Sequence, residues 1–194
     1  MAEAGFARFV SLACHDLRTP LATVSGFAYT LQQTEELGEP ASRYVEMIEA
    51  AAGQIAALLD DLGLVARIES GRYEPSLVEA DTLELVQEAA ELVGETAGAG
   101  GAGASVRVDR DPVRRALAGL ARCALRHGAL ERVELVAEGA TVAIGPVTPQ
   151  AAPIVLAEDL KDLGAGAARR VVEALGGSLS VEGDRLLVRL PTGG

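Results

Sequence analysis

Aromatic residues are scarce in this sequence. They make up 3 % of its 194 residues, and tryptophan is absent. The apolar half of the chain consists mostly of alanine, leucine, valine and glycine. The length nevertheless suffices for one or two small domains with a real hydrophobic core.

Cysteine, positive charge and long apolar runs are also in short supply. The two cysteines, Cys14 and Cys123, are too few for a disulfide framework or a zinc site, and we expect both to be core residues in a reducing cytoplasm. The net charge of −11 argues against nucleic acid or an anionic membrane as partner. With neither a membrane-spanning run nor a signal sequence, we expect a soluble, cytoplasmic protein. The chain has no room for a sensor domain before His15, so such a domain was either removed or never present.

The first part of the chain, residues 1–71, predicts a helical hairpin. Apolar residues recur every three or four positions from Phe6 to Leu31 and again in the segment after Pro40. Gly38 and Pro40 mark the turn, and Gly71 is placed to cap the end of the second helix. Each helix has an apolar face that one hairpin cannot bury, so we expect two hairpins to pair into a dimeric four-helix bundle.

Residues 15–21 read His-Asp-Leu-Arg-Thr-Pro-Leu on the first helix. The apolar stripe passes beside His15, so its imidazole is expected to face solvent, with Asp16 adjacent and Thr19 one turn further on the same side. This arrangement suits phosphoryl chemistry, because one ring nitrogen can act as a nucleophile while the acid holds the tautomer or accepts a proton. Pro20 removes a backbone donor and predicts a bend after this turn.

These seven residues strongly resemble the H-box of bacterial sensor histidine kinases. The resemblance implies that His15 is the phosphoacceptor, that Asp16 orients or deprotonates its imidazole, and that Arg18 offsets phosphate charge. It also associates Thr19 with phosphatase activity, through a water oriented at the phospho-aspartate of a receiver domain. The apolar docking patch for a receiver helix is expected to include Leu17, Leu21 and Val24.

The rest of the chain, residues 81–194 after a linker at 72–80, predicts an α/β sandwich with a mixed sheet. The fold class is therefore α+β, with the order α-β-α-β-β-α-β-β in the second domain. The Gly/Ala-rich residues 94–104 are expected to form a loop. Asp111 and Pro112 are expected to open a helix, and His127 and Gly128 to cap its end. Helices are predicted at residues 81–92, 111–125 and 163–175, and strands at 106–108, 133–136, 141–144, 178–181 and 185–190.

This order of elements resembles the ATP-binding domain of histidine kinases, the Bergerat-type fold, over about residues 78–191. The helix after residue 111 is similar to the N-box helix, and residues 169–179 are similar to the helix and strand that follow the G2 box. The whole chain thus resembles the dimeric histidine phosphotransferases of the ChpT type, which pair a kinase-like bundle with a degenerate ATP-binding domain.

Several departures from that family predict that nucleotide binding has been lost. The N-box asparagine that would hold Mg²⁺ aligns with Cys123, whose neutral thiol is a poor ligand for a hard cation. Residues 141–147 offer no aspartate to read adenine. Gly164 remains from the G2 box, but Asp162 would place a negative charge against the triphosphate. Only a short segment joins Val147 to Leu163 where the family has its lid. We therefore expect no tightly bound cofactor and no metal.

These observations predict a histidine phosphotransferase of a bacterial two-component phosphorelay. His15 would take a phosphoryl group from the aspartate of one receiver domain and pass it to another, while the receiver supplies Mg²⁺. Expected partners are the receiver domains of response regulators or hybrid kinases and a second copy of the chain, with neither nucleic acid nor membrane.

Three alternatives stay open. The chain could be the catalytic fragment of a sensor histidine kinase with a divergent but working ATP site. It could be a response-regulator phosphatase that uses Thr19. It could also be a non-catalytic pseudokinase that sequesters a receiver or pairs with a true kinase.

Overall fold

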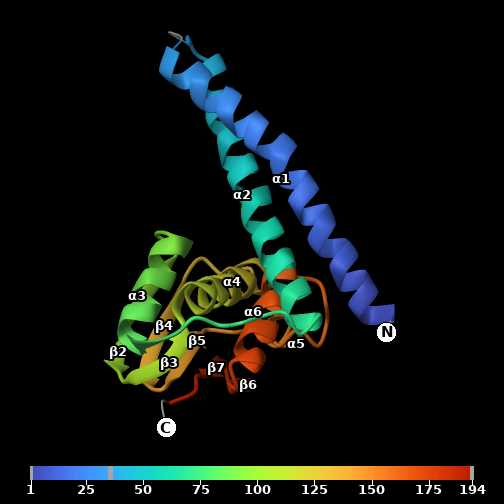
Figure 1. Cartoon of the computed structure of the whole chain (residues 1–194). Helices are drawn as coiled ribbons and strands as arrows, with labels where there is room; N and C mark the ends of the chain where they lie inside the picture. Colours follow the sequence, from blue (N-terminus) through green and yellow to red (C-terminus); the bar gives the residue numbers. More distant parts are fainter. Residues whose placement is uncertain (1, 35–36, 193–194) are drawn as a thin grey trace. The chain divides into compact units, whose positions relative to one another are not determined.

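The computed structural model describes residues 2–34 and 37–192, without the side chains of residues 2–5, 8, 9 and 34. The chain divides into two compact units, Met1–Tyr73 and Glu74–Gly194 (Figure 1). None of the helices in the described residues is long and apolar enough to cross a membrane.

The first unit is the expected hairpin of two long helices, α1 (Ala2–Thr34) and α2 (Ala41–Glu69). α1 continues through Pro20, although this residue cannot donate a hydrogen bond to the carbonyl one turn earlier. α2 ends at Glu69 with Ser70 as its C-cap residue, and Gly71 follows with a φ of +65°, a conformation that glycine adopts without steric cost.

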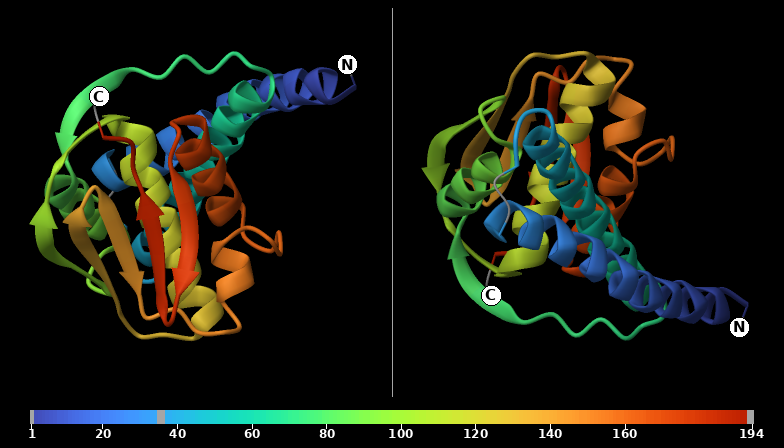
Figure 2. Two further views of the ribbon diagram at one scale, coloured as in Figure 1. Left: turned by 90° about the horizontal axis from the view of Figure 1, so that it is seen from below. Right: turned by 90° about the horizontal axis from the view of Figure 1, so that it is seen from above.

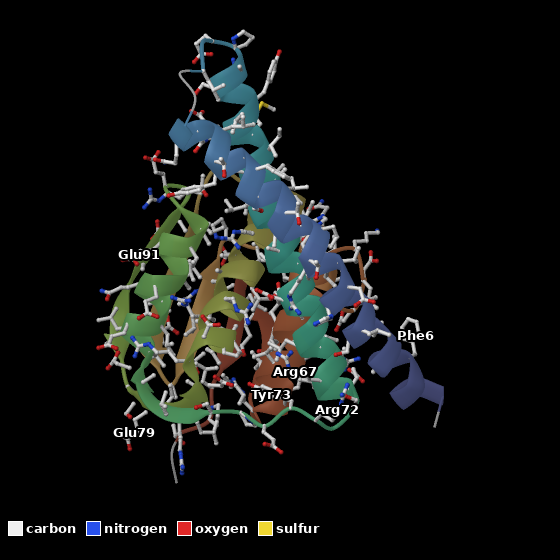
Figure 3. All side chains as sticks on the ribbon, turned by 45° about the horizontal axis from the view of Figure 1, so that its top comes forward. Phe6, Arg67, Arg72, Tyr73, Glu79 and Glu91 are labelled. Carbon is white, nitrogen blue, oxygen red and sulfur yellow. The ribbon has the colours of Figure 1, made fainter. Side chains whose placement is uncertain are left out.

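Small residues form much of the seam between the two helices. The buried apolar residues of this unit are Ala7, Cys14, Ala28, Val45, Ala52, Leu59, Leu64 and Ala66. The larger apolar side chains face outward instead, as Phe6 does near the start of α1 (Figure 3). The exposed ones are Phe6, Leu12, Leu17, Val24, Phe27, Tyr29, Leu31, Tyr44, Met47, Ile48, Ile55 and Leu58. A single hairpin thus leaves most of its large apolar side chains uncovered.

The second unit contains two sheets with helices. Its helices are α3 (Thr82–Val93), α4 (Arg110–Gly128), α5 (Ala152–Val155) and α6 (Leu163–Ala174). Its strands are β1 (Leu77–Asp81), β2 (Ala97–Gly103), β3 (Ser105–Asp109), β4 (Val133–Gly139), β5 (Thr141–Gly145), β6 (Ser178–Glu182) and β7 (Arg185–Arg189). β1 and β3 form an antiparallel pair. The main sheet has the order β2-β4-β5-β7-β6, in which only the β2–β4 pair is parallel, so the predicted mixed sheet is confirmed.

Helices α3, α4 and α6 cover one face of the main sheet (Figure 2). The core between these layers is aliphatic, with Leu85, Leu117, Leu135, Ile144 and Leu186 fully buried. Thr82, at the start of α3, is a polar residue that is also fully buried. Its hydroxyl donates to the Gly139 carbonyl at 2.6 Å and accepts from the Ala104 N–H at 2.9 Å. This polar contact ties α3 to the turn between β4 and β5.

The structure corrects the expected linker at residues 72–80 and the expected loop at residues 94–104. β1 begins at Leu77, inside the linker, and pairs with β3. The Gly/Ala-rich segment is β2, an edge strand that pairs in parallel with β4. Its composition has low strand propensity, but the long-range partner supplies the backbone hydrogen bonds.

Two further expectations need correction. α4 begins at Arg110 after Asp109, so Asp111 lies in the first turn rather than before the helix and pairs with Arg114 at 2.5 Å. The same helix ends with Ala129 in the left-handed conformation, so neither His127 nor Gly128 is its cap. The short helix α5 was not expected either.

Candidate functional site

His15 lies in the middle of α1 with its imidazole in solvent. Its side chain is 79 % exposed, and Nδ1 lies 3.2 Å from Oδ1 of the adjacent Asp16, which is also exposed. The Thr19 side chain is exposed one turn further along the helix. The structure therefore presents an accessible ring nitrogen beside a carboxylate and a hydroxyl, an arrangement suited to nucleophilic and proton-transfer chemistry.

Arg18 holds the two helices together next to this histidine. Its Nη2 donates to Oδ1 of Asp60 on α2 at 2.7 Å and to the Leu59 carbonyl at 3.4 Å. An open depression on the surface of the hairpin is lined by His15, Arg18, Thr19, Ala22 and Thr23. Arg18 thus borders the space in front of His15, while its guanidinium is already paired with a carboxylate.

The three residues expected to dock a receiver helix do not have equal exposure. Leu17 and Val24 are exposed, whereas Leu21 is half-buried. All three lie on α1 within three turns of His15. At about 100° per residue, the three side chains share one face of α1, which lies roughly half a turn around the helix from His15.

In the second unit, Cys123, Asp162 and Gly164 gather where α4 meets the start of α6. α4 and α6 pack closely here, since a Cβ added at Gly119 of α4 would be in van der Waals contact with the Gly164 carbonyl oxygen at 3.4 Å. Cys123 is buried on α4. Burial and, after it, the negative charge of Asp162 raise the pKa of the Cys123 thiol to about 12, so the thiol is neutral at pH 7.

The carboxylate of Asp162 is occupied by protein groups. Oδ1 accepts the Ala165 N–H at 3.0 Å and so caps α6. Oδ2 accepts from Nη1 of Arg126 at 3.0 Å and lies 3.3 Å from Nε2 of His127. The Asp162 side chain is only 5 % exposed, so these protein groups enclose it almost completely.

Cys123, His127 and Asp162 form a cluster that the sequence did not predict. One donor atom from each of these residues lies within 4.8 Å of the other two. The four-residue spacing of the cysteine and histidine on one helix was a visible signal. The approach of Asp162, which lies just before α6, could not be seen in the sequence. The junction of α4 and the start of α6 therefore carries sulfur, nitrogen and oxygen donors close together.

Comparison with known proteins agrees with the two-unit division. Residues 7–71 match the model of the His Kinase A (phospho-acceptor) domain, so the H-box lies within the matched segment. In Caulobacter vibrioides, the sensor protein DivL is 29 % identical over 103 residues, which is 53 % of this chain and 13 % of DivL. The histidine protein kinase DivJ of the same organism is 33 % identical over 92 residues, which is 46 % of this chain and 15 % of DivJ. The matches thus cover only a small part of each curated relative.

Solved structures share the fold of both units. Full-length ShkA in complex with AMPPNP matches 96 % of this chain and 47 % of its own, with a TM-score of 0.66 and 23 % identity. The ATP-binding domain of PrrB from Mycobacterium tuberculosis matches 61 % of this chain and 99 % of its own, with a TM-score of 0.51 and 21 % identity. Residues 7–71 are therefore similar to a phospho-acceptor domain, and the second unit has the fold of a histidine kinase ATP-binding domain.

Proposed function

We propose that this chain is a histidine phosphotransferase of a two-component phosphorelay. The observation that carries the proposal is the contrast between its two units. The hairpin presents an exposed His15 beside Asp16, whereas the second unit fills the expected nucleotide end with Cys123 and an Asp162 engaged by protein groups. His15 would therefore receive its phosphoryl group from a protein rather than from ATP.

The transfer follows from the contact between His15 and Asp16. In the tautomer that carries its proton on Nδ1, this N–H donates a hydrogen bond to the Asp16 carboxylate. Nε2 then carries the lone pair and attacks the phosphorus of a receiver aspartyl-phosphate. The N–P bond forms as the acyl O–P bond breaks, and the receiver carboxylate leaves. The imidazolium that results is stabilised by the Asp16 carboxylate, and the reverse step delivers the group to a second receiver. The receiver supplies the Mg²⁺ for both steps.

We propose further that the chain acts as a homodimer. The exposed apolar residues on α1 and α2 give each hairpin a surface that a second copy would cover. Leu17, Leu21 and Val24 remain assigned to the receiver. The phospho-acceptor match at residues 7–71 supports both contacts.

The alternative is a fragment of a sensor histidine kinase. The name of the relative DivJ and the bound AMPPNP in the ShkA structure favour it, since both belong to proteins that share sequence or fold with this chain. A kinase would need to bind ATP despite the charge of Asp162 and the thiol of Cys123.

A phosphotransfer assay with two donors separates these functions. In one arm the chain receives γ-labelled ATP with Mg²⁺, and in the other it receives a labelled phospho-receiver. We expect label on the unaltered chain from the receiver alone, and none on His15→Ala. Label from ATP would establish the kinase alternative instead. Faster loss of receiver phosphate without labelled His15, abolished by Thr19→Ala, would establish the phosphatase. Receiver binding without transfer or phosphate loss would establish the pseudokinase.

A further inference from the structure

Cys123, His127 and Asp162 bring three different donor atoms to one point inside the second unit. Cys123 and His127 lie four residues apart on one face of α4, and Asp162 reaches them from the start of α6. Their donor atoms lie within 4.8 Å of one another. Cys123 and Asp162 are buried and His127 is half-buried, so these groups face each other more than they face water.

We propose that this cluster binds Zn²⁺. A thiolate, an imidazole and a carboxylate are ligands that Zn²⁺ accepts together, and three protein ligands leave one position open in a tetrahedral site. Magnesium and calcium prefer oxygen ligands only, so the same cluster would discriminate against them. Zinc–ligand bonds of about 2.0–2.3 Å require the side chains to close by roughly 1 Å, which rotation of the His127 and Cys123 side chains can supply.

The two oxygens of Asp162 have separate partners, which lets the metal bind without loss of the helix cap. Oδ1 accepts the Ala165 N–H, and Oδ2 faces His127. Oδ2 also accepts from Arg126, whose side chain is 66 % exposed and can turn into solvent. Zinc at Oδ2 would therefore replace the guanidinium as the positive partner of the carboxylate.

The charges of the site favour replacement of the Arg126 guanidinium by Zn²⁺. On binding, the S–H bond of Cys123 breaks, its proton passes to the solvent, and a Zn–S bond forms. The thiolate and the Asp162 carboxylate then offset the dication, so the buried site is neutral. The bound metal would join α4 to the first turn of α6 and so stabilise the second unit.

Cobalt titration of the full chain tests the proposal. Co²⁺ added to the protein after treatment with a chelator is expected to give a thiolate-to-cobalt absorption band in the near ultraviolet. Zn²⁺ should displace the bound Co²⁺, with loss of this band, and should raise the Tm of the protein. We expect Cys123→Ser, His127→Gln and Asp162→Asn each to weaken binding by about tenfold or more, since even outer-shell partners cost that much. Asp162→Asn keeps an oxygen to cap α6, and circular dichroism verifies that each variant is folded.

The chain contains its own matched controls, because it has only two cysteines and two histidines. Cys14→Ser and His15→Gln are expected to leave the cobalt spectrum unchanged. Retention of the thiolate band in Cys14→Ser assigns it to Cys123 even where Cys123→Ser does not fold. Absence of a thiolate band in the unaltered chain, or its loss in Cys14→Ser, would overturn the proposal. These readouts do not depend on phosphotransfer.

Discussion

The two histidines of this chain show how surroundings decide the chemistry of one residue type. His15 lies in solvent beside an exposed carboxylate, whereas His127 is half-buried beside a buried one. The first is accessible to a large protein substrate such as a receiver domain. The His127 side chain lies between α4 and the Asp162 carboxylate, so it is accessible to a small ion and not to a protein surface.

The Asp16 carboxylate is expected to matter for the rate at which His15 accepts a phosphoryl group. Asp16→Asn keeps the shape of the side chain but removes the charge that orients Nδ1 and stabilises the imidazolium. We predict a loss of about 100-fold or more in the rate of labelling from a phospho-receiver. Quench-flow or gel-based transfer assays measure it. Glu46→Gln, at another exposed carboxylate of the hairpin, serves as the control, and an equal loss there would contradict the assigned role.

A pH effect is expected at Glu88 in the second unit. The hydrogen bond from Arg110, at 2.5 Å, lowers the pKa of Glu88 below its usual 4.5. The charged carboxylate is thus favoured by folding. Its stabilisation is present above the unfolded pKa and disappears as the pH falls through the lowered pKa. Arg110→Gln should therefore reduce Tm at pH 7 and have less effect near pH 3. The same reduction at both pH values would contradict this assignment.

At the scale of elements, β2 is the strand whose composition and structure disagree most. Its backbone approaches β4 so closely that a Cβ at Gly101 would lie 2.2 Å from the Ala137 carbonyl oxygen, and Gly101 has a φ of +106°. Near the end of β2, a Cβ at Gly103 would lie 2.0 Å from the Asp81 carboxylate that caps α3. Glycine is therefore required here by close packing, and the segment only resembles a flexible loop in its composition.

Substitutions in β2 should show whether its glycines are required by close packing or only reflect a flexible segment. Gly101→Ala combines a strained φ with a backbone clash, so we predict a loss of about 2 kcal/mol or more in the free energy of unfolding. Gly100→Ala meets no atom within 4 Å and should change stability by less than about 0.5 kcal/mol. Chemical denaturation of both variants measures the difference. Equal effects at the two positions would show that β2 behaves as a loop.

At the scale of the whole molecule, the main feature is the apolar surface of the hairpin, which a single chain leaves exposed to water. Ile48 and Ile55 lie seven residues apart on α2, so they share a face, and they are 45 % and 48 % exposed. In a four-helix bundle such residues fill the centre, whereas in a single hairpin they face water.

The proposed homodimer predicts the result of placing charge on that face. Ile48→Glu combined with Ile55→Glu is expected to shift the chain from dimer to monomer, because the carboxylates would be buried without partners. Size-exclusion chromatography with light scattering gives the mass. Gln54→Glu, beside Ile55 and exposed, should leave the dimer intact. A monomeric unaltered chain, or a double variant that stays dimeric, would contradict the proposed interface.

The sequence by itself determined what depends on neighbouring residues. Residues 15–21 are contiguous, so their resemblance to an H-box is visible without the fold, and helical periodicity located both helices of the hairpin. Only the tertiary structure decided what depends on distant residues. β2 is a strand because β4 pairs with it. Asp162 is buried beside His127, 35 residues away in sequence, because α6 packs on α4 through Gly119 and Gly164. Local propensity contains no information about such contacts, since their energy arises only when packing brings the partners together.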